Sequence, residues 1–509
     1  MAVTDLVLIF PPVALPSEPP LGIATLAASL RRLGARVELV DANVEGLHHL
    51  VASVPDEAAR DEAGRRALKL RARALAQLRS SVGYADRDRH HAAVGALRRT
   101  LAIADAEGAA DVADYHHPGM SPFELSDLQR AAGGSACAYD AYFEGLAARV
   151  SERSPRVVGI SINYLHQVLP GLALAGVLRR RLGPGVGIMA GGGLISSWRG
   201  RLDPGCLSPT VDRLVLGDGV AALARELGLP APPPRWDPPD YTGLPWELYL
   251  APVRIAPATT SVGCYWNACR YCPQAAVGQR YQTTFGDGLA RAFEEICRRT
   301  GAGLVHVTDS AVPPANLRRL AALDGAVPWY GFGRFHADLT DLDFCRELRR
   351  GGCRMLKLGL ESGSPRVLRR LNKGIDLTRA SAALRALRRA GVAVYLYVMF
   401  GIPGERRDDA ERTLAFVADH APCIDFINVS LLNLPISTPP EPGLELRRVP
   451  RYGELSLYTG FEDREGWERR EARLFLERDF RRHPAVGPIL RRTPHVFGAN
   501  HAPFFVGEG

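Results

Sequence analysis

Short apolar runs alternate with longer stretches of helical periodicity along most of this 509-residue chain. Residues 6–10 form an apolar run closed by Pro11 and Pro12, a helical pattern follows over 20–33, and a second apolar run occupies 37–40. Runs of this length fit strands, whereas longer segments with apolar residues every three or four positions fit helices. The start of the chain therefore predicts a strand, a helix and a second strand of a parallel sheet.

A long region rich in Arg and Ala, from about 51 to 153, carries helical patterns alone. Apolar runs return at 157–161, 186–190 and 213–216, and glycines follow the last two of them. We therefore expect residues 1–235 to form a Rossmann-like, doubly wound α/β domain with a helical insertion. In such domains the ligand lies in the crevice along the carboxyl ends of the strands.

Beyond a Pro-rich linker at 228–245, the same alternation continues to about residue 440. The apolar runs of this part lie at 304–307, 329–332, 355–360, 392–399 and 425–429. Repeated βα units with polar residues just past the strands are typical of a barrel whose chemistry lies at its carboxyl-terminal rim. We expect a partial (β/α)6 TIM barrel over 250–440 and a small carboxyl-terminal cap over 441–509.

Composition indicates a globular protein, since 46% of the residues are hydrophobic and 23% are charged. No run approaches the roughly 18 apolar residues of a membrane span, and the amino terminus lacks a signal-peptide layout. The net charge of +8 comes almost entirely from arginines spread along the predicted helices. That pattern is typical of solvated helix faces rather than of a surface that follows phosphates. We expect a cytoplasmic protein with no membrane or nucleic-acid partner.

Three cysteines, Cys264, Cys269 and Cys272, lie within nine residues of one another at the start of the predicted barrel. Thiolates at such short spacing are the usual ligands of iron–sulfur clusters. The alternative is a structural zinc site, but it needs four ligands, normally in two spaced pairs, and the other six cysteines are scattered. An odd total of nine also argues against a disulfide framework. The loop predicts a [4Fe–4S] cluster with one open iron.

This loop resembles that of the radical S-adenosylmethionine (SAM) enzymes, in which an aromatic residue precedes the third cysteine, as Tyr271 does here. Four residues separate Cys264 from Cys269, where the family usually has a shorter first gap, and relatives with a cobalamin domain share the Cys-Tyr-Trp opening. The resemblance implies a B12-binding-type domain followed by a radical SAM barrel. It also implies that the cluster cleaves SAM to a 5′-deoxyadenosyl radical, which takes hydrogen from an unactivated carbon.

Polar and glycine residues that follow the barrel strands are candidates for holding SAM. This molecule carries an ammonium, a carboxylate, a ribose diol and an adenine, so it needs acceptors, a cation and an apolar slot together. A lone acidic residue after a strand is more often a helix cap, but several such sites follow successive strands here. By the resemblance, the SAM-binding residues are Tyr271, Asp309, Arg334, Glu361, Ser362, Gly401 and Gly404.

The amino-terminal sheet resembles the corrinoid-binding domain of relatives with this domain order. Glycines at strand ends let the backbone approach a bulky ring and its nucleotide tail. The alternative is a sheet that keeps the fold and binds no cofactor. By the resemblance, the cobalamin-binding residues are Pro12, Gly22, Ser161, Asn163, Gly191, Gly192, Gly193 and Gly217.

Residues 114–119 match the Asp-x-His-x-x-Gly signature, in which the histidine, here His116, becomes the lower cobalt ligand. That signature belongs directly after the first strand, whereas His116 lies in the predicted helical insertion. Asn163 also stands where the signature has leucine. A motif match needs the right structural context, and this context argues against His116 as a ligand.

The predicted function is a cobalamin-dependent radical SAM C-methyltransferase. A radical rearrangement, oxidation or cyclisation without methyl transfer would use the same cofactors, so the sequence does not separate these reactions. A non-catalytic corrinoid- or SAM-binding sensor is a further alternative, although no recognisable output module follows the barrel. A methylthiotransferase would need more cluster-binding cysteines in the amino-terminal half. The expected partners are a small-molecule or peptide substrate and a reductase or flavodoxin-type electron donor.

Overall fold

The computed structural model describes residues 4–105, 110–134, 137–233, 236–276, 280–323, 327–440, 444–450, 452–463, 467–494 and 501–506. The chain divides into two compact units. The first unit consists of Met1–Ala256 and Gly453–Leu455, and the second of Pro257–Tyr452 and Ser456–Gly509.

A five-stranded sheet in the order β2-β1-β3-β4-β5 forms the centre of the first unit. Its strands are β1 (Leu6–Phe10), β2 (Val37–Asp41), β3 (Val157–Ser161), β4 (Gly187–Gly191) and β5 (Arg213–Leu214), and all neighbouring pairs are parallel. Every residue of β1 and β3 is buried, because helices cover both faces of the sheet. This confirms the predicted doubly wound arrangement.

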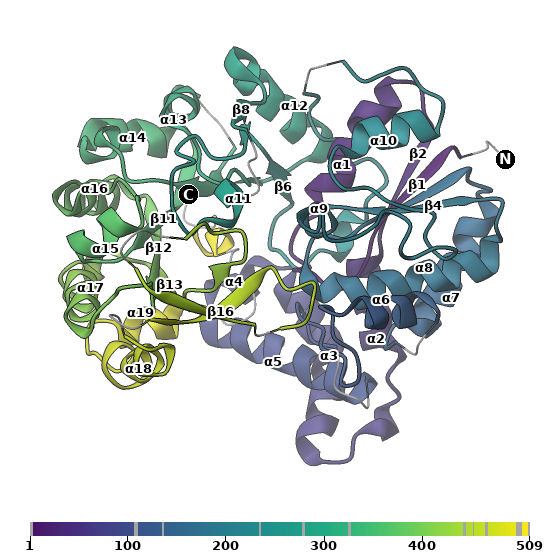
Figure 1. The fold of residues 1–509 in the computed structure, drawn as a ribbon, viewed down its shortest axis with the longest axis horizontal. Helices are drawn as coiled ribbons and strands as arrows, with labels where there is room; N and C mark the ends of the chain where they lie inside the picture. Colours follow the sequence, from purple (N-terminus) through teal and green to yellow (C-terminus); the bar gives the residue numbers. More distant parts are fainter. Residues whose placement is uncertain are drawn as a thin grey trace. The chain divides into compact units, whose positions relative to one another are not determined.

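The helices that cover this sheet include α1 and α10 on one face and α8 on the other (Figure 1). Their bounds, with those of the shorter elements nearby, are α1 (Leu21–Arg32), η2 (Leu165–Gln167), α8 (Val168–Leu182), α9 (Gly193–Ser197), α10 (Gly219–Glu226) and η3 (Trp246–Leu248). The carboxyl ends of β3 and β4 open toward α8 and α9, where a doubly wound sheet holds its ligand.

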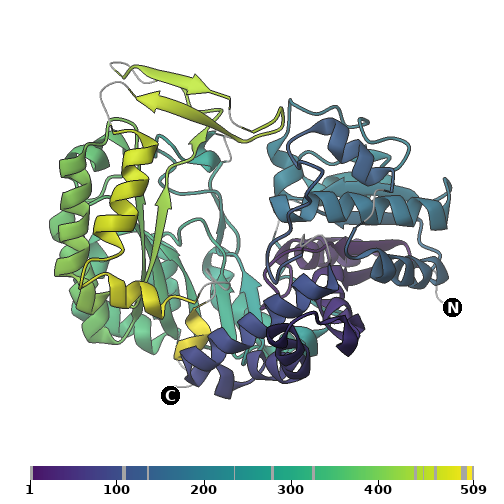
Figure 2. The same cartoon turned by 90° about the horizontal axis from the view of Figure 1, so that it is seen from below.

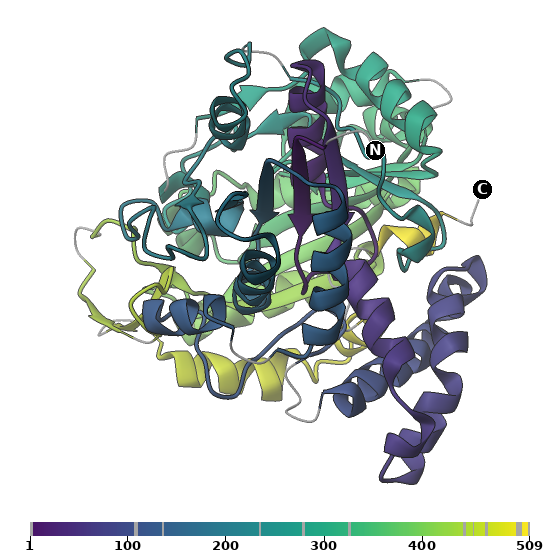
Figure 3. The same cartoon turned by 90° about the vertical axis from the view of Figure 1, so that its right-hand side faces the viewer.

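The predicted helical insertion is present between β2 and β3. Its elements are α2 (Ala42–Ser53), η1 (Asp56–Ala58), α3 (Glu62–Leu78), α4 (Ser81–Ala85), α5 (Arg87–Ala104), α6 (Leu125–Ala132) and α7 (Asp140–Glu152). Asp41, Asp61 and Asp86 start three of these helices by accepting hydrogen bonds from backbone N–H groups of the first turn. Helices α3 and α5 pack against each other along their length (Figure 3).

A six-stranded sheet in the order β13-β12-β11-β10-β9-β6 forms the second unit, which confirms the partial (β/α)6 barrel. Its strands are β6 (Ile255–Ala258), β9 (Leu304–Val307), β10 (Trp329–Gly333), β11 (Cys353–Glu361), β12 (Ala393–Phe400) and β13 (Phe426–Leu431). The pairs from β9 to β13 are parallel, so their carboxyl ends share one rim.

Helices line the outer face of this sheet (Figure 2). They are α12 (Leu289–Thr300), α13 (Pro314–Ala321), α14 (Leu342–Arg350), α15 (Pro365–Arg370), α16 (Leu377–Ala390) and α17 (Arg407–Asp419), with the short turns η4 (Gly286–Gly288), η5 (Ala337–Thr340) and η6 (Ala421–Cys423). Helices α12 and α14 are strongly amphipathic, with Phe293, Ile296 and Leu348 among their buried residues. An apolar face of this kind produces the three-to-four-residue period that predicts a helix from sequence.

The carboxyl-terminal segment forms a small antiparallel sheet in the order β14-β16-β15 and a group of short helices. Their bounds are β14 (Leu434–Pro435), β15 (Leu446–Val449), β16 (Tyr458–Asp463), α18 (Arg469–Phe475), η7 (Leu476–Phe480), α19 (Gly487–Arg492) and η8 (Ala502–Phe505). His501 is fully buried, with its ring centroid 4.8 Å from that of Tyr395 and 4.6 Å from that of Phe426. The tail therefore contributes to the packing of the barrel.

Within the part of the chain that the structure describes, no helix combines the length and the apolar character that a membrane crossing needs.

Candidate functional site

The cysteine loop lies in the second unit between the paired strands β7 (Ser261–Val262) and β8 (Gln282–Thr283), and it leads into α11 (Pro273–Ala276). All three thiols are free and partly exposed. No three His, Cys, Asp or Glu residues among those described are arranged to hold one metal ion. Three thiols are the donor set of a cluster with one open iron, whereas a closed zinc site needs four ligands.

Asp309 follows β9, as predicted, and its carboxylate is fully engaged with the entrance of the cysteine loop. It accepts hydrogen bonds from Thr260 N and Thr260 Oγ1, both at 2.6 Å, and from Ser261 Oγ at 2.5 Å. Burial raises the pKa of Asp309, while these donors oppose the rise. The carboxylate therefore fixes the chain just before Cys264.

Arg334 follows β10 and also lies against the cysteine loop. Its Nη1 is 3.7 Å from Cys269 Sγ. Burial raises the pKa of the Cys269 thiol, while the charges of Lys373 and Arg334 oppose the rise. These two cations favour the thiolate, which is the form that binds iron.

Glu361 ends β11 and lies at the rim with an unusual backbone. Its φ is +67°, and the register of β11 against β12 shifts between Gly359 and Glu361. A non-glycine residue in the left-handed region costs free energy, and such residues are common at functional sites. The carboxylate accepts a hydrogen bond from Lys373 Nζ at 2.7 Å, and its side chain is 21% exposed. Glu361 thus presents a partly accessible carboxylate at the rim.

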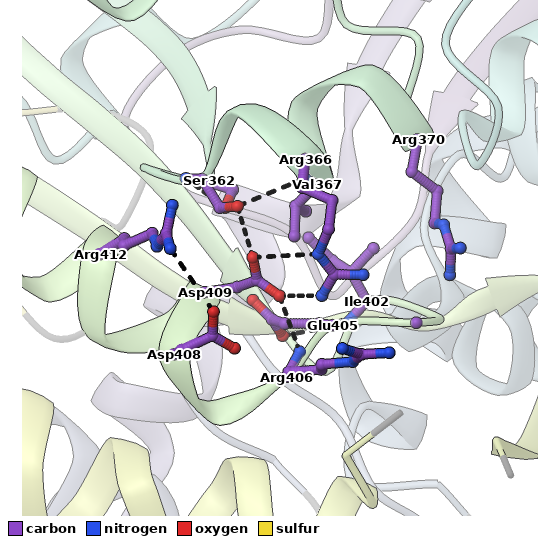
Figure 4. A network of polar contacts seen from close by, with 12 residues as sticks. Ser362, Arg366, Val367, Arg370, Ile402, Glu405, Arg406, Asp408, Asp409 and Arg412 are labelled. Carbon is purple, nitrogen blue, oxygen red and sulfur yellow. Dashed lines mark hydrogen bonds and ion pairs between the residues drawn. The ribbon is translucent and has the colours of Figure 1, made fainter. Parts of the chain in front are cut away.

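Ser362 is buried, and its hydroxyl lies 3.1 Å from Thr413 Oγ1 on α17. The neighbouring polar network joins the end of β11 to the starts of α15 and α17. In this network, Asp409 Oδ1 accepts from Ser364 Oγ at 2.5 Å, and the carboxylate pairs with Arg366 (Figure 4). The hydroxyl of Ser362 therefore forms hydrogen bonds within the protein, to Thr413 of α17 and to the N–H of Ser364 before α15.

The segment 401–405 forms a tight turn after β12. Gly401 and Gly404 have φ values of +67° and +72°, and Glu405 Oε2 accepts from the N–H groups of Gly401 at 2.6 Å and of Ile402 at 3.2 Å. Tyr271 belongs to the same apolar cluster as Ile402, so the cysteine loop and this turn share one packing core. The cluster consists of Tyr271, Val367, Leu371, Ile402, Leu432 and Leu434.

Glu405→Gln is expected to remove a pH dependence of stability. Burial raises the pKa of Glu405 from 4.5 to about 8, so the protonated carboxyl stabilises the fold fully below about pH 4.5 and this contribution is lost as pH rises through about 8. The neutral glutamine should keep a level free energy of unfolding where the wild type loses on the order of a few kcal/mol. Urea unfolding at a series of pH values measures the difference, and parallel pH profiles would contradict it.

The first unit contains a cavity at the carboxyl ends of β3 and β4. Four of the predicted cobalamin residues line it, namely Ser161, Gly191, Gly192 and Gly217. Its other lining residues are Leu8, Leu26, Gly159, Ile160, Met189, Val215, Gly219 and Leu223. Gly192 has a φ of +112°, and a Cβ at this position would lie 2.3 Å from the backbone oxygen of Ile162, so only glycine fits. The glycines that line this apolar slot let a ligand approach the backbone at the strand ends closely.

The other predicted cobalamin residues lie beside this cavity or apart from it. Asn163 Nδ2 donates to Ser161 Oγ at 3.0 Å, and Asn163 Oδ1 accepts from Gly193 N at 2.8 Å. A Cβ on Gly22 would lie 3.8 Å from Ser161 Oγ. Pro12 is buried after β1 and is not a lining residue.

His116 is exposed in the segment between α5 and α6. Asp114 of the same match pairs instead with His166, whose Nδ1 lies 2.6 Å from Asp114 Oδ1. His116 thus lies in the helical insertion and is not a lining residue of the cavity at the strand ends.

Residues 259–417 match the family model of the Radical SAM superfamily. This part of the chain is a radical SAM domain. The matched residues run from just before β7 to α17. They include the cysteine loop and the site residues Asp309, Arg334, Glu361 and Ser362.

Two further comparisons concern larger parts of the chain. The uncharacterized methyltransferase PH0819 of Pyrococcus horikoshii is 26% identical over 192 residues, which cover 35% of this chain and 40% of that protein. The radical SAM methyltransferase TsrM from Kitasatospora setae, solved with cobalamin and a [4Fe–4S] cluster, has a TM-score of 0.53 at 16% identity and covers 87% of this chain and 81% of its own. This chain thus shares the fold of TsrM over most of its length.

Three residues at the cysteine loop were not predicted from sequence, namely Trp266, Asn372 and Lys373. Trp266 Nε1 donates to Asn372 O at 2.8 Å, and Asn372 Nδ2 donates back to Ala268 O at 2.9 Å. A positive φ of +50° at Asn372 fits the asparagine-glycine pattern of the segment 372–374, which was the available sequence signal for a turn.

Proposed function

We propose that this radical SAM protein is a cobalamin-dependent methyltransferase that acts on an unactivated carbon of a small molecule or peptide. Two features within one chain carry the proposal: a three-cysteine loop at the rim of a radical SAM barrel, and a glycine-lined cavity in a separate doubly wound domain. The methyltransferase description of PH0819 and the cobalamin and cluster in TsrM support methyl transfer over the other reactions.

The three thiols of the cysteine loop are the donor set that a cluster with one open iron needs, and the glycine-lined cavity lies where a doubly wound sheet takes its ligand. When bound, the cluster supplies an electron to SAM and the corrinoid carries the methyl group. Cys264, Cys269 and Cys272 would hold the cluster. The protein itself would fix the cysteine loop through the contacts of Asp309 and Arg334. In the first unit, the backbone of Gly192 packs closely against that of Ile162 beside the cavity.

The ion pair between Glu361 and Lys373 offers SAM an acceptor and a cation at the rim. Their 2.7 Å contact brings together the two charge types that complement the ammonium and carboxylate of SAM. The turn at Gly401 and Gly404, packed with Tyr271, provides the apolar surface for the adenine. The side chains of Asp309 and Ser362 would act indirectly, by holding the loop and the helices in place.

Glu361→Gln is expected to weaken SAM binding while the cluster stays in place. Removing a charge from a hydrogen-bonded group costs about 1.5 to 3 kcal/mol, which corresponds to a roughly tenfold or larger rise in the Kd of SAM. Equilibrium dialysis against SAM measures the change, and the iron content serves as the control. Equal Kd values for the two proteins would remove Glu361 from the SAM site.

The proposed function is tested by anaerobic reconstitution with iron, sulfide and hydroxocobalamin, followed by reduction in the presence of SAM labelled in its methyl group. We expect label on the protein-bound corrinoid fraction and 5′-deoxyadenosine in solution. Formation of 5′-deoxyadenosine without corrinoid-bound label would favour a radical rearrangement, oxidation or cyclisation instead. Binding of both cofactors with neither product would favour a non-catalytic sensor.

A small-molecule substrate is supported by TsrM, whose structure has been solved with tryptophan as substrate and a SAM analogue bound. A peptide substrate and a reductase or flavodoxin-type electron donor complete the proposal. Adding candidate donors to the labelled assay would identify the reductant by the rate at which 5′-deoxyadenosine forms.

A further inference from the structure

Arg334 makes two contacts with the cysteine loop and one with the segment 371–374. Its Nη1 lies 3.7 Å from Cys269 Sγ, its Nη2 donates to Lys373 O, and its guanidinium carbon lies 4.7 Å from the centre of the Trp266 ring. The side chain is only 7% exposed. A guanidinium that is stacked on one side and bonded on two edges has a fixed orientation.

The surface on which Arg334 lies is itself rigidly held. Trp266 and Asn372 exchange hydrogen bonds with the opposite segments, and Arg270 N donates to Leu371 O at 3.0 Å. Gly374 leaves room for the indole, since a Cβ there would lie 2.4 Å from the Trp266 ring. The segment 371–374 is therefore joined to the cysteine loop by hydrogen bonds at Trp266, Ala268 and Arg270.

Trp266, which contacts the segment 371–374, lies between the first two cysteines of the loop. Asn267 has a φ of +42°, which turns the chain sharply directly after Trp266. Trp266 and Asn267 are two of the four residues between Cys264 and Cys269, so the longer gap contains the ring on which Arg334 stacks. The longer gap and Arg334 thus belong to one arrangement.

The charge of Arg334 is not neutralised by a carboxylate among the described residues, whereas Lys373 is paired with Glu361 at 2.7 Å. Its nearest polar neighbours are the Cys269 sulfur, a backbone carbonyl and the Tyr265 phenol. Arg334 therefore combines a positive charge with a direct contact to the sulfur of a predicted cluster ligand, while the charge of Lys373 also favours the thiolate.

We propose that Arg334 is a positioning residue that raises the reduction potential of the cluster by donating a hydrogen bond and a positive charge to the Cys269 thiolate. The inference rests on the proposed function, because it requires the cluster. A [4Fe–4S] cluster gains one negative charge when it accepts an electron. Hydrogen bonds to its sulfurs and nearby positive charge stabilise the reduced form, which is how the surrounding protein tunes such potentials.

The test compares the wild type with Arg334→Met, Arg334→Gln and Arg334→Lys after anaerobic reconstitution. An EPR-monitored redox titration measures the potential of each cluster. We expect Arg334→Met to reduce the equilibrium constant for one-electron reduction about tenfold, which corresponds to about 59 mV for one electron. Arg334→Gln keeps an N–H donor without the charge and should fall by less, and Arg334→Lys should lie closest to the wild type.

The control is Arg298→Met, which removes an exposed arginine of α12 that pairs with Glu295 at 2.7 Å. Its cluster potential should equal that of the wild type. If Arg334→Met fails to retain the cluster, Arg334→Gln decides the matter. A wild-type potential in a fully loaded Arg334→Gln or Arg334→Met protein would overturn the inference. Failure of the wild type itself to bind a cluster would instead overturn the proposed function.

Discussion

Cys269→Ala is expected to abolish the cluster and, with it, SAM cleavage. The residue lies at the centre of the loop, where the Cys272 N–H donates to its carbonyl oxygen at 3.3 Å and Arg334 faces its sulfur. A cluster with one open iron needs three thiolates from the protein, so the loss of one leaves a second iron without a protein ligand and only two anchor points. Iron content, absorption and EPR spectra after reconstitution should all fall close to background.

Cys297→Ala is the matched control for this experiment. Cys297 lies on α12, outside the loop, and is partly exposed like Cys269. Burial raises the pKa of its thiol to about 11, so it is a poor metal ligand at neutral pH. We expect wild-type iron content in this variant. Retention of the full cluster by Cys269→Ala would show that the metal is bound elsewhere in the chain.

Ser161→Phe is expected to abolish cobalamin binding without disturbing the cluster. Ser161 ends β3, is 7% exposed and lines the cavity together with Gly191 and Gly192. A phenyl ring at this position would fill the cavity. The bound ligand would then have no space at the strand ends. After reconstitution with hydroxocobalamin and gel filtration, the absorbance of the bound corrinoid should fall to a small fraction of the wild-type value.

Ser161→Ala separates the loss of space from the loss of the hydroxyl. It removes the hydrogen bond that Asn163 Nδ2 donates to Ser161 Oγ at 3.0 Å, at a net cost of about 1 kcal/mol, and leaves the cavity open. We expect this variant to bind cobalamin nearly as the wild type does. Stoichiometric corrinoid in Ser161→Phe would mean that the cavity is not the binding site, provided that the iron content of both variants is normal.

Most of the fold could be predicted from the sequence because the strands are buried on both faces. The apolar runs at 157–161 and 304–307 match β3 and β9 residue for residue, and the amphipathic pattern at 342–350 matches α14. A continuous apolar run bounded by polar residues has few other interpretations in an α/β chain. Local pattern therefore sufficed wherever one element is buried by its immediate neighbours.

The short elements could not be predicted, because tertiary contacts rather than local pattern define them. Helix α15 has only six residues, and β14 pairs through two. Such elements are too short for a helical or alternating period to be recognised. Strands β15 and β16 were therefore expected only as part of an undivided cap over 441–509, and β14 lies within the segment 250–440 that was predicted as barrel.

The positions of the candidate site residues were predictable, but the directions of their side chains were not. Asp309, Arg334 and Ser362 all follow strands at the rim, as the pattern indicated. A carboxylate or guanidinium in such a place can face the barrel or a neighbouring loop, and the choice depends on residues far away in sequence. Asp309 is hydrogen-bonded to Thr260, and Ser362 to Thr413. The two residues of each pair lie about 50 positions apart, so no local sequence pattern connects them.

The double attachment of the cysteine loop has a consequence for the life of the enzyme in air. Many small metal-binding modules unfold when their metal leaves, because the metal itself supplies the folding energy. Here the loop is tied at one end to Asp309 and at the other to the segment 371–374 by bonds between protein groups alone. Oxygen that destroys the cluster should therefore leave a folded chain behind, which can take up a new cluster once iron, sulfide and a reductant are supplied.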